Sequence, residues 1–572
     1  MGLVLTAQLY QFAANKKAAL EDSGEIHGQL PELSLELVEQ FFNRLSPEDK
    51  AMVLRHKVLP VASLPHFTLY GAAGFAAADR AAQSGQRVIA SIDPHDLRLT
   101  IRRKLGPELL HKATHYLRLR RPKYSAFTRV TGSQFLWYFI FLAWIFAAWK
   151  LLNPFYFYAA LSFLCGIFFL AVVALRLLCL LQDTAKRPPV FPTLDDDDLP
   201  DYTVLVPVFR ERKVLGQLVA SLARLNYPKE KLDIKIILEE TDTPMQRAVA
   251  ALDLPDYFDV IVVPSGKPQT KPRALNYALQ FARGQLLTIY DAEDMPEPMQ
   301  LRKAAEHFAA AVPELACLQA ELAFYNSNEN WLTRQFTVEY ATLFKLILPG
   351  LAVQRLPILL GGTSNHFRIS ILRDLGAWDP FNVTEDADLG IRLARAGFGT
   401  AALDSITYEE ANPVFDNWLQ QRSRWLKGFL QTWQVHMRSP IQLGQEIGLD
   451  GFWAMQAMTF GLMVSALFHP ILLGHAIYLI FSGTLALQAV SLPMAILAGL
   501  NIAVLITGYA FSIYAGYYAL RRKRIKGWWI VLATMPGYWM LISLAGWMAL
   551  WQFIFRPFHW NKTRHGLSRF QQ

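Results

Sequence analysis

Carboxylate side chains stand at the ends of two short β-rich runs in the middle of this 572-residue chain. Glu211 comes just after the run "VLVPVF", and Glu239 and Glu240 end the run "DIKIILEE". Ligands of open α/β sheets bind beyond the carboxyl ends of the strands, so these acids are candidate ligand-binding residues. Each of them alone could instead be a strand-end cap or a solvated loop residue.

A third acidic segment, "DAED", follows the apolar run "QLLTIY" and contains Asp291, Glu293 and Asp294. Hard oxygen ligands at this spacing suit Mg²⁺ or Mn²⁺, which proteins bind through one or two carboxylates plus substrate phosphates. Lys271 and Arg273, in "TKPRALNYAL", could neutralise a diphosphate beside such an ion. The alternative is an ordinary basic helix start, which is less usual because the helix dipole disfavours cations there.

Further acids open a predicted helix in "FNVTEDADLGIRLARAG" (381–397). Thr384 is placed to cap this helix, and Glu385, Asp386 and Asp388 lie in its first turn. Acids in a first turn complement the helix dipole, which is the ordinary interpretation. The functional interpretation is that one of them is a general base. The segment alone favours neither.

Glutamine, arginine and tryptophan side chains converge in "NWLQQRSRWLKGF" (417–429). On a helix, positions i, i+3 and i+4 share one face, which here holds Gln421, Arg424 and Trp425. Trp418 extends that face, whereas Arg422 and Lys427 fall elsewhere, where a membrane-surface or phosphate role is open. The segment is either an amphipathic helix on a membrane or the lining of a site.

The elements that must position these residues lie between 190 and 445. This region alternates short β-rich runs with helical segments and shows no clean membrane span, which is the pattern of βαβ units on a mostly parallel sheet. The predicted strands are "TVLVPVF", "DIKIILEE", "DVIVVP" and "QLLTIYD". The run "DDDD" (195–198) before the first strand is better explained as a solvated linker than as a metal site.

Apolar stretches flank this region on both sides. Hydrophobic residues make up 53% of the chain, and the formal net charge is +9. Residues 132–152 and 155–181 are each long enough to span a bilayer. Because "RLRRPK" precedes the pair and "KRPP" follows it, we expect a hairpin with both ends in the cytoplasm. Three cysteines imply neither a disulfide framework nor a zinc site.

Later spans are expected near 457–482 and 490–519, and "RRKRIKG" then returns the chain to the inside. A last stretch, 528–555, is interrupted by Met535-Pro536-Gly537, and we expect a broken or re-entrant arrangement that keeps the tail inside. Four to six spans are expected. The predicted division is therefore an N-terminal soluble domain (1–125), a hairpin (132–182), an α/β domain (190–445), C-terminal membrane and interfacial helices (450–555) and a cytoplasmic tail (556–572).

An acid after the first strand, a D-x-D-like segment, "TED" and Q-x-x-R-W occur in this order between candidate spans. In this the chain resembles the processive family 2 glycosyltransferases, such as bacterial cellulose synthase and hyaluronan synthase. The resemblance covers about 200–445 and extends to the spans. It implies an α/β fold, with a GT-A type domain inserted between α-helical transmembrane segments, plus a small α/β N-terminal domain.

The resemblance implies a role for each matching residue. Contacts to the nucleotide-sugar donor would come from Glu211, Glu239, Glu240, Lys271, Asp291 and Glu293. Because "DAED" stands where the family has D-x-D, the metal ligands would be found among Asp291, Glu293 and Asp294. Catalysis would depend on Glu385 and Asp386, with Asp386 as the base.

The resemblance also implies an acceptor site and a gating loop. The acceptor would be bound by Gln421, Arg424, Trp425 and His366. The tail "WNKTRHG" stands where related synthases have a loop that closes over the nucleotide, although it does not match the cellulose synthase version. Its candidate gating residues are Lys562, Thr563 and His565.

The N-terminal part has a weaker resemblance. "HKVLPV" with "RVIASIDPHDL" is similar to the amino-terminal domain of type II secretion ATPases, some relatives of which bind cyclic di-GMP. The dinucleotide-binding repeat of that domain is not evident here, so cyclic di-GMP is kept as a candidate partner only.

Together these features predict a multi-pass enzyme of the bacterial inner membrane with a cytoplasmic catalytic domain. It would polymerise a β-linked polysaccharide from a nucleotide sugar, with UDP-glucose favoured, and translocate the growing glycan. Export partners in the periplasm or outer membrane are expected, and no nucleic acid. The alternatives are a non-processive transferase that acts on a lipid acceptor, and a transferase-like receptor or scaffold without catalysis.

Overall fold

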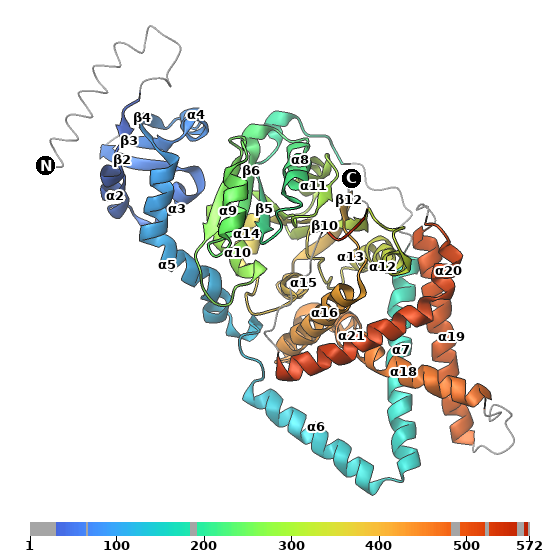
Figure 1. Cartoon of the computed structure of the whole chain (residues 1–572). Coiled ribbons are helices and arrows are strands. Elements are labelled where there is room, and N and C mark those ends of the chain that lie inside the picture. Colours follow the sequence, from blue (N-terminus) through green and yellow to red (C-terminus); the bar gives the residue numbers. More distant parts are fainter. Residues whose placement is uncertain are drawn as a thin grey trace.

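The computed structural model describes residues 30–64, 67–182, 191–481, 492–520, 525–556 and 566–569. A small α/β unit at the N-terminus leads into a larger α/β unit, and long apolar helices extend from the latter on one side (Figure 1). The predicted fold class is confirmed, with a mixed, mostly parallel sheet between apolar helical segments.

The N-terminal unit is a four-stranded sheet in the order β1-β4-β3-β2. Its strands are β1 (Glu32–Leu33), β2 (Val58–Leu64), β3 (Phe67–Ala73) and β4 (Arg87–Ile92). Its helices are α2 (Leu35–Asn43), α3 (Pro47–His56), α4 (Phe75–Gln83) and α5 (Pro94–Arg120). Helix α5 begins where the Asp93 side chain accepts a hydrogen bond from the backbone N–H of His95, at 2.7 Å, with Pro94 in the first helical position.

The larger sheet has eight strands in the order β7-β6-β5-β8-β11-β10-β12-β9. In that order they are β7 (Phe258–Val263), β6 (Leu232–Glu239), β5 (Tyr202–Val208), β8 (Leu286–Ile289), β11 (Asn365–Arg368), β10 (Leu315–Phe324), β12 (Gly399–Glu409) and β9 (Met295–Pro296). The first four are parallel, as is the β10–β12 pair, whereas β11 and β9 run antiparallel to their neighbours. The four predicted strands are confirmed, and the nearly complete burial of β5 and β6 explains their continuous apolar runs.

Helices cover the faces of this sheet and close one end of it. They are α8 (Leu215–Ala223), α9 (Thr243–Ala250), α10 (Lys271–Ala278), α11 (Gln300–Ala310), α14 (Ile369–Asp374), α15 (Glu385–Arg395) and α16 (Phe415–His436). Helices α12 (Trp331–Thr342) and α13 (Leu348–Val353) are joined by a π-helical turn, Leu343–Ile347.

The N-terminal unit is docked on the larger one through α5 and α10. Asn276 of α10 and Gln280 of the short 3-10 turn that follows it donate hydrogen bonds to the carbonyls of Ala113 and Leu109, each at 3.0 Å. Lys57 forms an ion pair of 3.0 Å with Asp259 of β7. These contacts hold the N-terminal unit against the side of the sheet where β6 and β7 lie.

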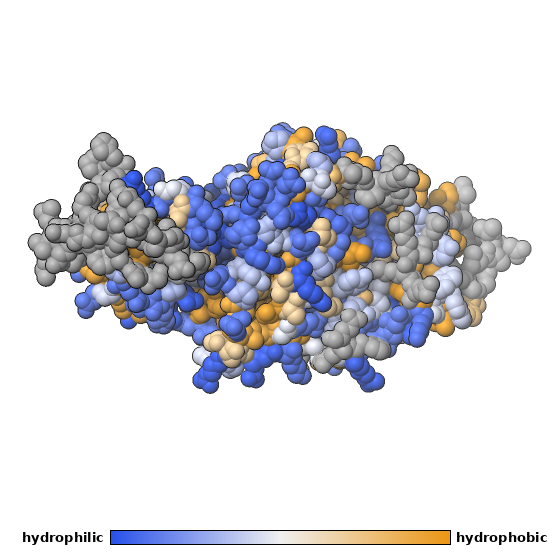
Figure 2. Space-filling model, turned by 90° about the horizontal axis from the view of Figure 1, so that it is seen from above, coloured by the Kyte–Doolittle hydropathy of each residue, from blue (hydrophilic) through white to orange (hydrophobic). Residues whose placement is uncertain are grey.

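The apolar helices outside the α/β units are α6 (Gly132–Leu151), α7 (Pro154–Leu181), α17 (Pro440–Met458), α18 (Phe460–Phe481), α19 (Leu492–Leu520), α20 (Trp528–Ala533) and α21 (Met535–Phe555). Among the described residues, five helices are long and apolar enough to cross a membrane, or up to six with the bent pair α17–α18. Figure 1 shows α7 and α19 side by side and α6 standing apart, while α21 packs against α16 and α18. Seen from above, the opposite end of the molecule is largely hydrophilic (Figure 2).

One expectation about the spans needs correction, whereas the expected break in the last apolar stretch is present. The α12–α13 segment, Trp331–Val353, is also long and apolar enough to cross a membrane, although we expected no span in this region from the sequence. This segment is more deeply packed than the other candidates, because 56% of its most apolar residues are buried inside the protein. Its apolar character therefore suits a protein core as well as a bilayer. The predicted break near Met535 is present at Thr534, between α20 and α21.

Candidate active site

A cavity of about 830 Å³ lies where the carboxyl ends of the strands, α15, α16 and the membrane helices meet. Most of the predicted site residues line it, namely Glu211, Glu239, Lys271, Asp291, Glu293, Glu385, Asp386, Gln421, Arg424 and Trp425. Three predicted residues do not line it, namely Glu240, Asp294 and His366. The fold thus brings segments that are distant in the sequence together around one cavity.

Lys271 joins two loops of this cavity. Its ammonium group lies 2.6 Å from Asp291 Oδ1 and donates to the carbonyl oxygen of Gly362 at 2.7 Å. Burial alone would lower the pKa of Lys271, but Asp291, Asp386 and Glu385 raise it well above its ordinary value. This lysine therefore stays charged and holds the "DAED" loop against the Gly361-Gly362 turn.

The three acids of "DAED" have different surroundings. Asp294 is 1% exposed, and its Oδ2 accepts hydrogen bonds from the hydroxyl of Thr363 and, at 2.8 Å, from the backbone N–H of Asp291. Burial and the adjacent Asp291 and Glu293 raise the pKa of Asp294 well above its ordinary value. Asp294 therefore shapes the loop, and Asp291 and Glu293 are the two acids of this segment that reach the cavity.

The two acids at the end of β6 also have different surroundings. Glu239 lines the cavity and is held by the fully buried Arg273, whose Nη2 lies 2.7 Å from Glu239 Oε2. Arg273 thus positions an acid of the cavity wall and does not itself reach the cavity. Glu240 points the other way, where it pairs with Arg102 of α5 and accepts the backbone N–H of Ser265 at 2.9 Å. The structure therefore gives no support to a donor contact from Glu240.

His366 lies inside the sheet and not in the acceptor region. Its Nδ1 is 2.6 Å from the hydroxyl of Tyr202, its Nε2 is 3.3 Å from Gln300 Oε1, and the residue is 0% exposed. Burial lowers the pKa of His366 to about 3. The expected acceptor contact is corrected to a core role, because alternate residues of a strand point to opposite faces and His366 falls on the packed one.

The "TED" segment opens α15 as predicted. Asp386 lines the cavity, and its Oδ1 is buried without a hydrogen-bond partner among the described residues. Burial and the neighbouring Glu385 raise the pKa of Asp386 well above its ordinary value, and Lys271 opposes that shift. Thr384 stands at the N-cap position, but its side chain makes no capping hydrogen bond.

The helix α16 presents its predicted face to the cavity. Trp425 stacks on Tyr340 of α12 with ring centroids 6.1 Å apart. Burial lowers the pKa of Arg424, and the nearby Glu385 and Asp291 only partly offset this by raising it. A side chain at Gly428 would come within 2.3 Å of Thr384, so the absence of a Cβ lets α16 lie directly against the "TED" segment.

Arg422 is also part of the cavity wall, and the membrane-surface role left open for it is wrong. Its guanidinium makes a double contact with Glu339, with Nη1 2.7 Å from Oε1, and donates to the hydroxyl of Tyr538 at 3.2 Å. Its Cζ lies 4.8 Å from the centroid of the Trp425 ring. Trp418 is fully buried beside Tyr538 and lies outside the cavity lining, so it does not extend the acceptor face.

Two acids of the cavity were missed by the sequence interpretation. Glu409 ends β12, and burial together with Asp294 and Glu293 raises its pKa well above its ordinary value. Glu410 follows and accepts the backbone N–H groups of Leu567 and Ser568 at 2.7 and 2.6 Å. Their signal was the same as for Glu239, an acid at the carboxyl end of a strand, but β12 was not predicted.

The contact with Glu410 places residues 566–569 beside an acid that lines the cavity. Residues 566–569 lie against Glu410 and Glu329, on the side of the α/β unit. This agrees with the expectation that the tail is on the same side as the catalytic domain. The predicted gating residues Lys562, Thr563 and His565 lie outside the described residues.

A divalent cation fits the chemistry of this cavity, although no cluster of three acidic, histidine or cysteine ligands occurs among the described residues. Asp291 and Glu293 supply carboxylate oxygens on the wall, and Mg²⁺ or Mn²⁺ needs few protein ligands when phosphates complete its shell. The acids that crowd this wall also raise one another's pKa, so their excess negative charge favours a cation.

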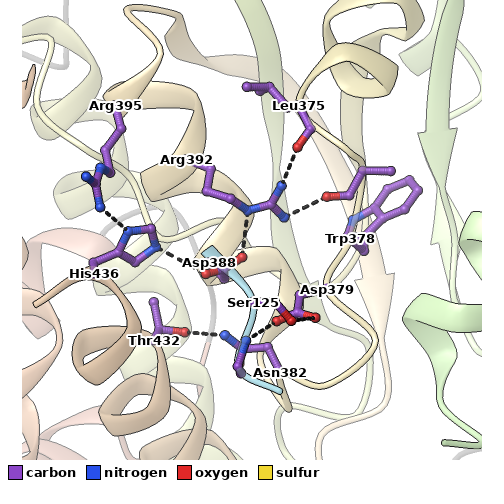
Figure 3. A network of polar contacts seen from close by, with 12 residues as sticks. Ser125, Leu375, Trp378, Asp379, Asn382, Asp388, Arg392, Arg395, Thr432 and His436 are labelled. Carbon is purple, nitrogen blue, oxygen red and sulfur yellow. Dashed lines mark hydrogen bonds and ion pairs between the residues drawn. The ribbon is translucent and has the colours of Figure 1, made fainter. Parts of the chain in front are cut away.

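The opposite side of α15 is held by a buried polar network (Figure 3). Asp388 lies 2.7 Å from Arg392 Nε and 3.1 Å from His436 Nε2 of α16. Arg392 also donates to the carbonyls of Leu375 and Ala377, at 3.0 and 2.6 Å. This network fixes α15 to α16 and thereby sets the distance between the "TED" acids and the Q-x-x-R-W face.

The linker between α5 and α6 joins the same region. Asp379 accepts hydrogen bonds from the hydroxyl of Ser125 at 3.1 Å and from the backbone N–H of Ala126 at 2.5 Å. Burial and Asp388 raise the pKa of Asp379 to about 6. The chain that connects the N-terminal unit to the membrane hairpin is therefore tied to the loop that precedes "TED".

Residues 286–560 match the model of a family described as Glycosyl transferase family group 2. This match includes the "DAED", "TED" and Q-x-x-R-W segments and continues through α21. The chain is 26% identical over 240 residues to a probable glycosyltransferase, YdaM, of Bacillus subtilis, which covers 40% of this chain and 56% of that protein. It is 26% identical over 302 residues to the β-monoglucosyldiacylglycerol synthase of Synechocystis, covering 50% and 60% of the two chains.

A probable glucomannan 4-β-mannosyltransferase of Arabidopsis thaliana is 23% identical over 240 residues, 41% of this chain and 43% of that protein. The chain thus spans about half the length of the curated relatives that it matches. Among solved structures, a mannosyltransferase of Pyrobaculum calidifontis in complex with GDP-mannose and Mn²⁺ superposes with a TM-score of 0.42 and 15% identity, over 68% of this chain and 99% of that one.

Proposed function

We propose that this chain, which carries a glycosyltransferase family 2 domain, transfers a hexose with inversion from a nucleotide sugar to an acceptor that arrives from the membrane side. One observation supports this most directly. The same cavity that holds the acids of the sheet continues past Trp425 to residues of α7, α18, α19 and α21. Donor and acceptor can therefore meet at Asp386 from opposite ends.

The chain's own residues supply the steps of the transfer. Asp386, as the base, takes the proton of the acceptor hydroxyl while that oxygen attacks the anomeric carbon in line, and the sugar–phosphate bond breaks. Lys271 and Arg424 offset the negative charge that develops on the leaving nucleoside diphosphate. Asp291 and Glu293 would hold a divalent cation, which would supply further charge stabilisation for the diphosphate and favour the ionised form of the nearby carboxylates.

For the acceptor we favour a growing β-linked glycan, with UDP-glucose as the donor. Trp425 offers a ring face at the cavity wall, with Arg424 and Gln421 on the same side of α16. On this proposal the chain polymerises a polysaccharide and passes it through the bacterial inner membrane to export partners, with the α/β unit in the cytoplasm. Binding of cyclic di-GMP to residues 1–125 stays a prediction.

A second candidate acceptor is a membrane lipid. The membrane half of the cavity is lined mainly by apolar side chains such as Phe169, Leu462 and Val504, which suit lipid chains better than sugar hydroxyls. One of the relatives reported above is named as a synthase of a glycosylated diacylglycerol. A scaffold without catalysis is disfavoured, because a binding-only domain has no need to keep an unpartnered buried carboxylate at Asp386.

The experiment uses the full chain reconstituted in lipid nanodiscs. It is incubated with a panel of UDP- and GDP-hexoses, and release of the nucleoside diphosphate is measured with and without EDTA. The product is then extracted, separated into lipid and polymer fractions, and digested with linkage-specific glycosidases. Metal-dependent release with labelled sugar in either fraction supports the proposal, whereas absence of release with every donor contradicts it.

A further inference from the structure

Arg176 is a cation on a membrane helix that faces the inside of the protein. Phe169, Val172, Val173 and Arg176 line the cavity together, and their spacing of three and four residues places them on one face of α7. An arginine on this face does not point to the lipid around the helix. Since arginine keeps its charge at all ordinary pH values, it needs a negatively charged or strongly hydrogen-bonding neighbour.

The acid that acts electrostatically on Arg176 is Glu339 of α12. Glu339 is already neutralised, because Arg422 makes a double contact with it and Tyr538 donates a hydrogen bond to its Oε2 at 2.7 Å. Among the described residues no ion pair joins Arg176 to a carboxylate. The cluster formed by Arg176, Glu339 and Arg422 therefore carries one positive charge in excess, on the wall of the cavity.

The height of Arg176 along α7 suits a lipid headgroup. It lies five residues before the last residue of α7, which is about 8 Å at 1.5 Å per residue. Near this end α7 touches the α/β unit, since a side chain at Gly350 would come within 2.6 Å of Cys179. With 28 residues, α7 is longer than a hydrocarbon core of about 30 Å requires, and its candidate span, Ala160–Leu181, ends where the helix ends. Arg176 therefore lies near the end of the span, from which a long arginine side chain can reach the headgroup level.

A groove of about 580 Å³ lies between α7 and α19, next to the cavity that Arg176 lines. Leu177, Leu180, Thr507 and Tyr514 are among the residues that line it. Val173 and Phe511 line both the groove and the cavity, so one continuous face of α7 connects the two. The groove is apolar along α7 and has hydroxyl groups along α19.

We propose that Arg176, next to the Glu339–Arg422 pair, binds the phosphate of a glycerophospholipid whose chain lies in the groove between α7 and α19. A phosphodiester carries one negative charge, which matches the one uncompensated charge of the cluster, and the guanidinium fork fits phosphate oxygens. The inference depends on the proposed function only for the path of the acceptor, which a lipid at this position would border or enter.

The test measures lipid binding to the full chain directly, by native mass spectrometry of protein released from detergent. The probes are phosphatidylglycerol and phosphatidylcholine, which both carry a phosphodiester, and diacylglycerol, which carries none. We expect the wild type to retain both phospholipids, and Arg176→Gln to bind them about tenfold more weakly, with no change for diacylglycerol. Arg176→Lys, which keeps the charge but loses the fork, is expected to fall between.

Arg556→Gln is the matched control, because Arg556 is an exposed cation at the end of α21, outside the cavity lining. It should bind all three lipids like the wild type. Equal phospholipid retention by Arg176→Gln and the wild type, or an equal loss in Arg556→Gln, would overturn the proposal. Nucleoside diphosphate release is measured separately on the wild type, so a failure of the proposed function leaves the lipid result interpretable.

Discussion

Two aspartates two positions apart on α15 have opposite surroundings. Asp386 faces the cavity with an unpartnered oxygen, and burial together with Glu385 raises its pKa. Asp388 faces the protein, where burial would also raise its pKa, but Arg392 and His436 outweigh burial and lower it (Figure 3). One turn of helix thus contains an acid kept reactive by lack of partners and an acid kept inert by two of them.

The largest expected effect comes from removing the reactive acid. Asp386→Asn keeps the shape of the side chain but cannot take a proton, so we expect transfer to fall by at least about 100-fold. Donor binding should remain, because Asp386 acts on the acceptor. Nucleoside diphosphate release and calorimetric binding of the donor check the two halves of this prediction. Release at the wild-type rate would show that the base is another residue.

The inert acid should give the reverse result. Asp388→Asn leaves Arg392 buried without its carboxylate, which we expect to reduce the free energy of unfolding by about 3 kcal/mol. Thermal unfolding in detergent measures this loss. The transfer rate per folded molecule should fall far less than in Asp386→Asn, because Asp388 only positions α15 against α16, and a loss as large as that of Asp386→Asn would place Asp388 in the chemistry.

A buried histidine, His366, extends the comparison, because its hydrogen-bond partners are Tyr202 and Gln300 and not a carboxylate. The pKa of His366 is lowered from 6.5 to about 3 by burial, so the unfolded state binds more protons between these values. Stability is therefore full above pH 6.5 and falls as the pH falls, by about 2 kcal/mol at pH 5. Thermal unfolding at several pH values tests this, with His366→Gln expected to remove much of the slope. An unchanged slope would assign the acid sensitivity to other groups.

Two tryptophans on α16 give the smallest predicted effect. Trp425→Ala should reduce transfer to the acceptor about tenfold while donor hydrolysis continues, because in the proposed function the ring contacts the acceptor and not the donor. Trp418→Ala is the comparison, since Trp418 is fully buried and should lower stability without separating transfer from hydrolysis. Equal ratios of transfer to hydrolysis in the two variants would contradict an acceptor role for Trp425.

The sequence predicted those parts of the site that depend on local pattern. The strands, the acids at their ends, the helix after "TED" and the shared face of Gln421, Arg424 and Trp425 all follow from spacing along the chain. What it could not predict depends on packing between distant segments. Glu339 pairs with Arg422 across 83 residues, and Arg273 holds Glu239 across 34.

The same limit explains the residues that were placed wrongly or left open. Asp294 and Glu293 are neighbours, and only the contact of Asp294 with Thr363 decides which of them reaches the cavity. His366 lies beside a Gly-Gly turn that does line the cavity, but its strand orients it toward Tyr202. Amino-acid type and spacing do not determine which side of a loop faces inward.

The close approach at Gly428 has a consequence for engineering. At Gly428, helix α16 and the "TED" segment lie closer together than a single added methyl group would allow. Libraries that vary α16 therefore have a fixed point, because the methyl group of even an alanine at this position would clash with the side chain of Thr384 and push the two elements apart. A graft of α16 into a related scaffold would need to bring this glycine with it.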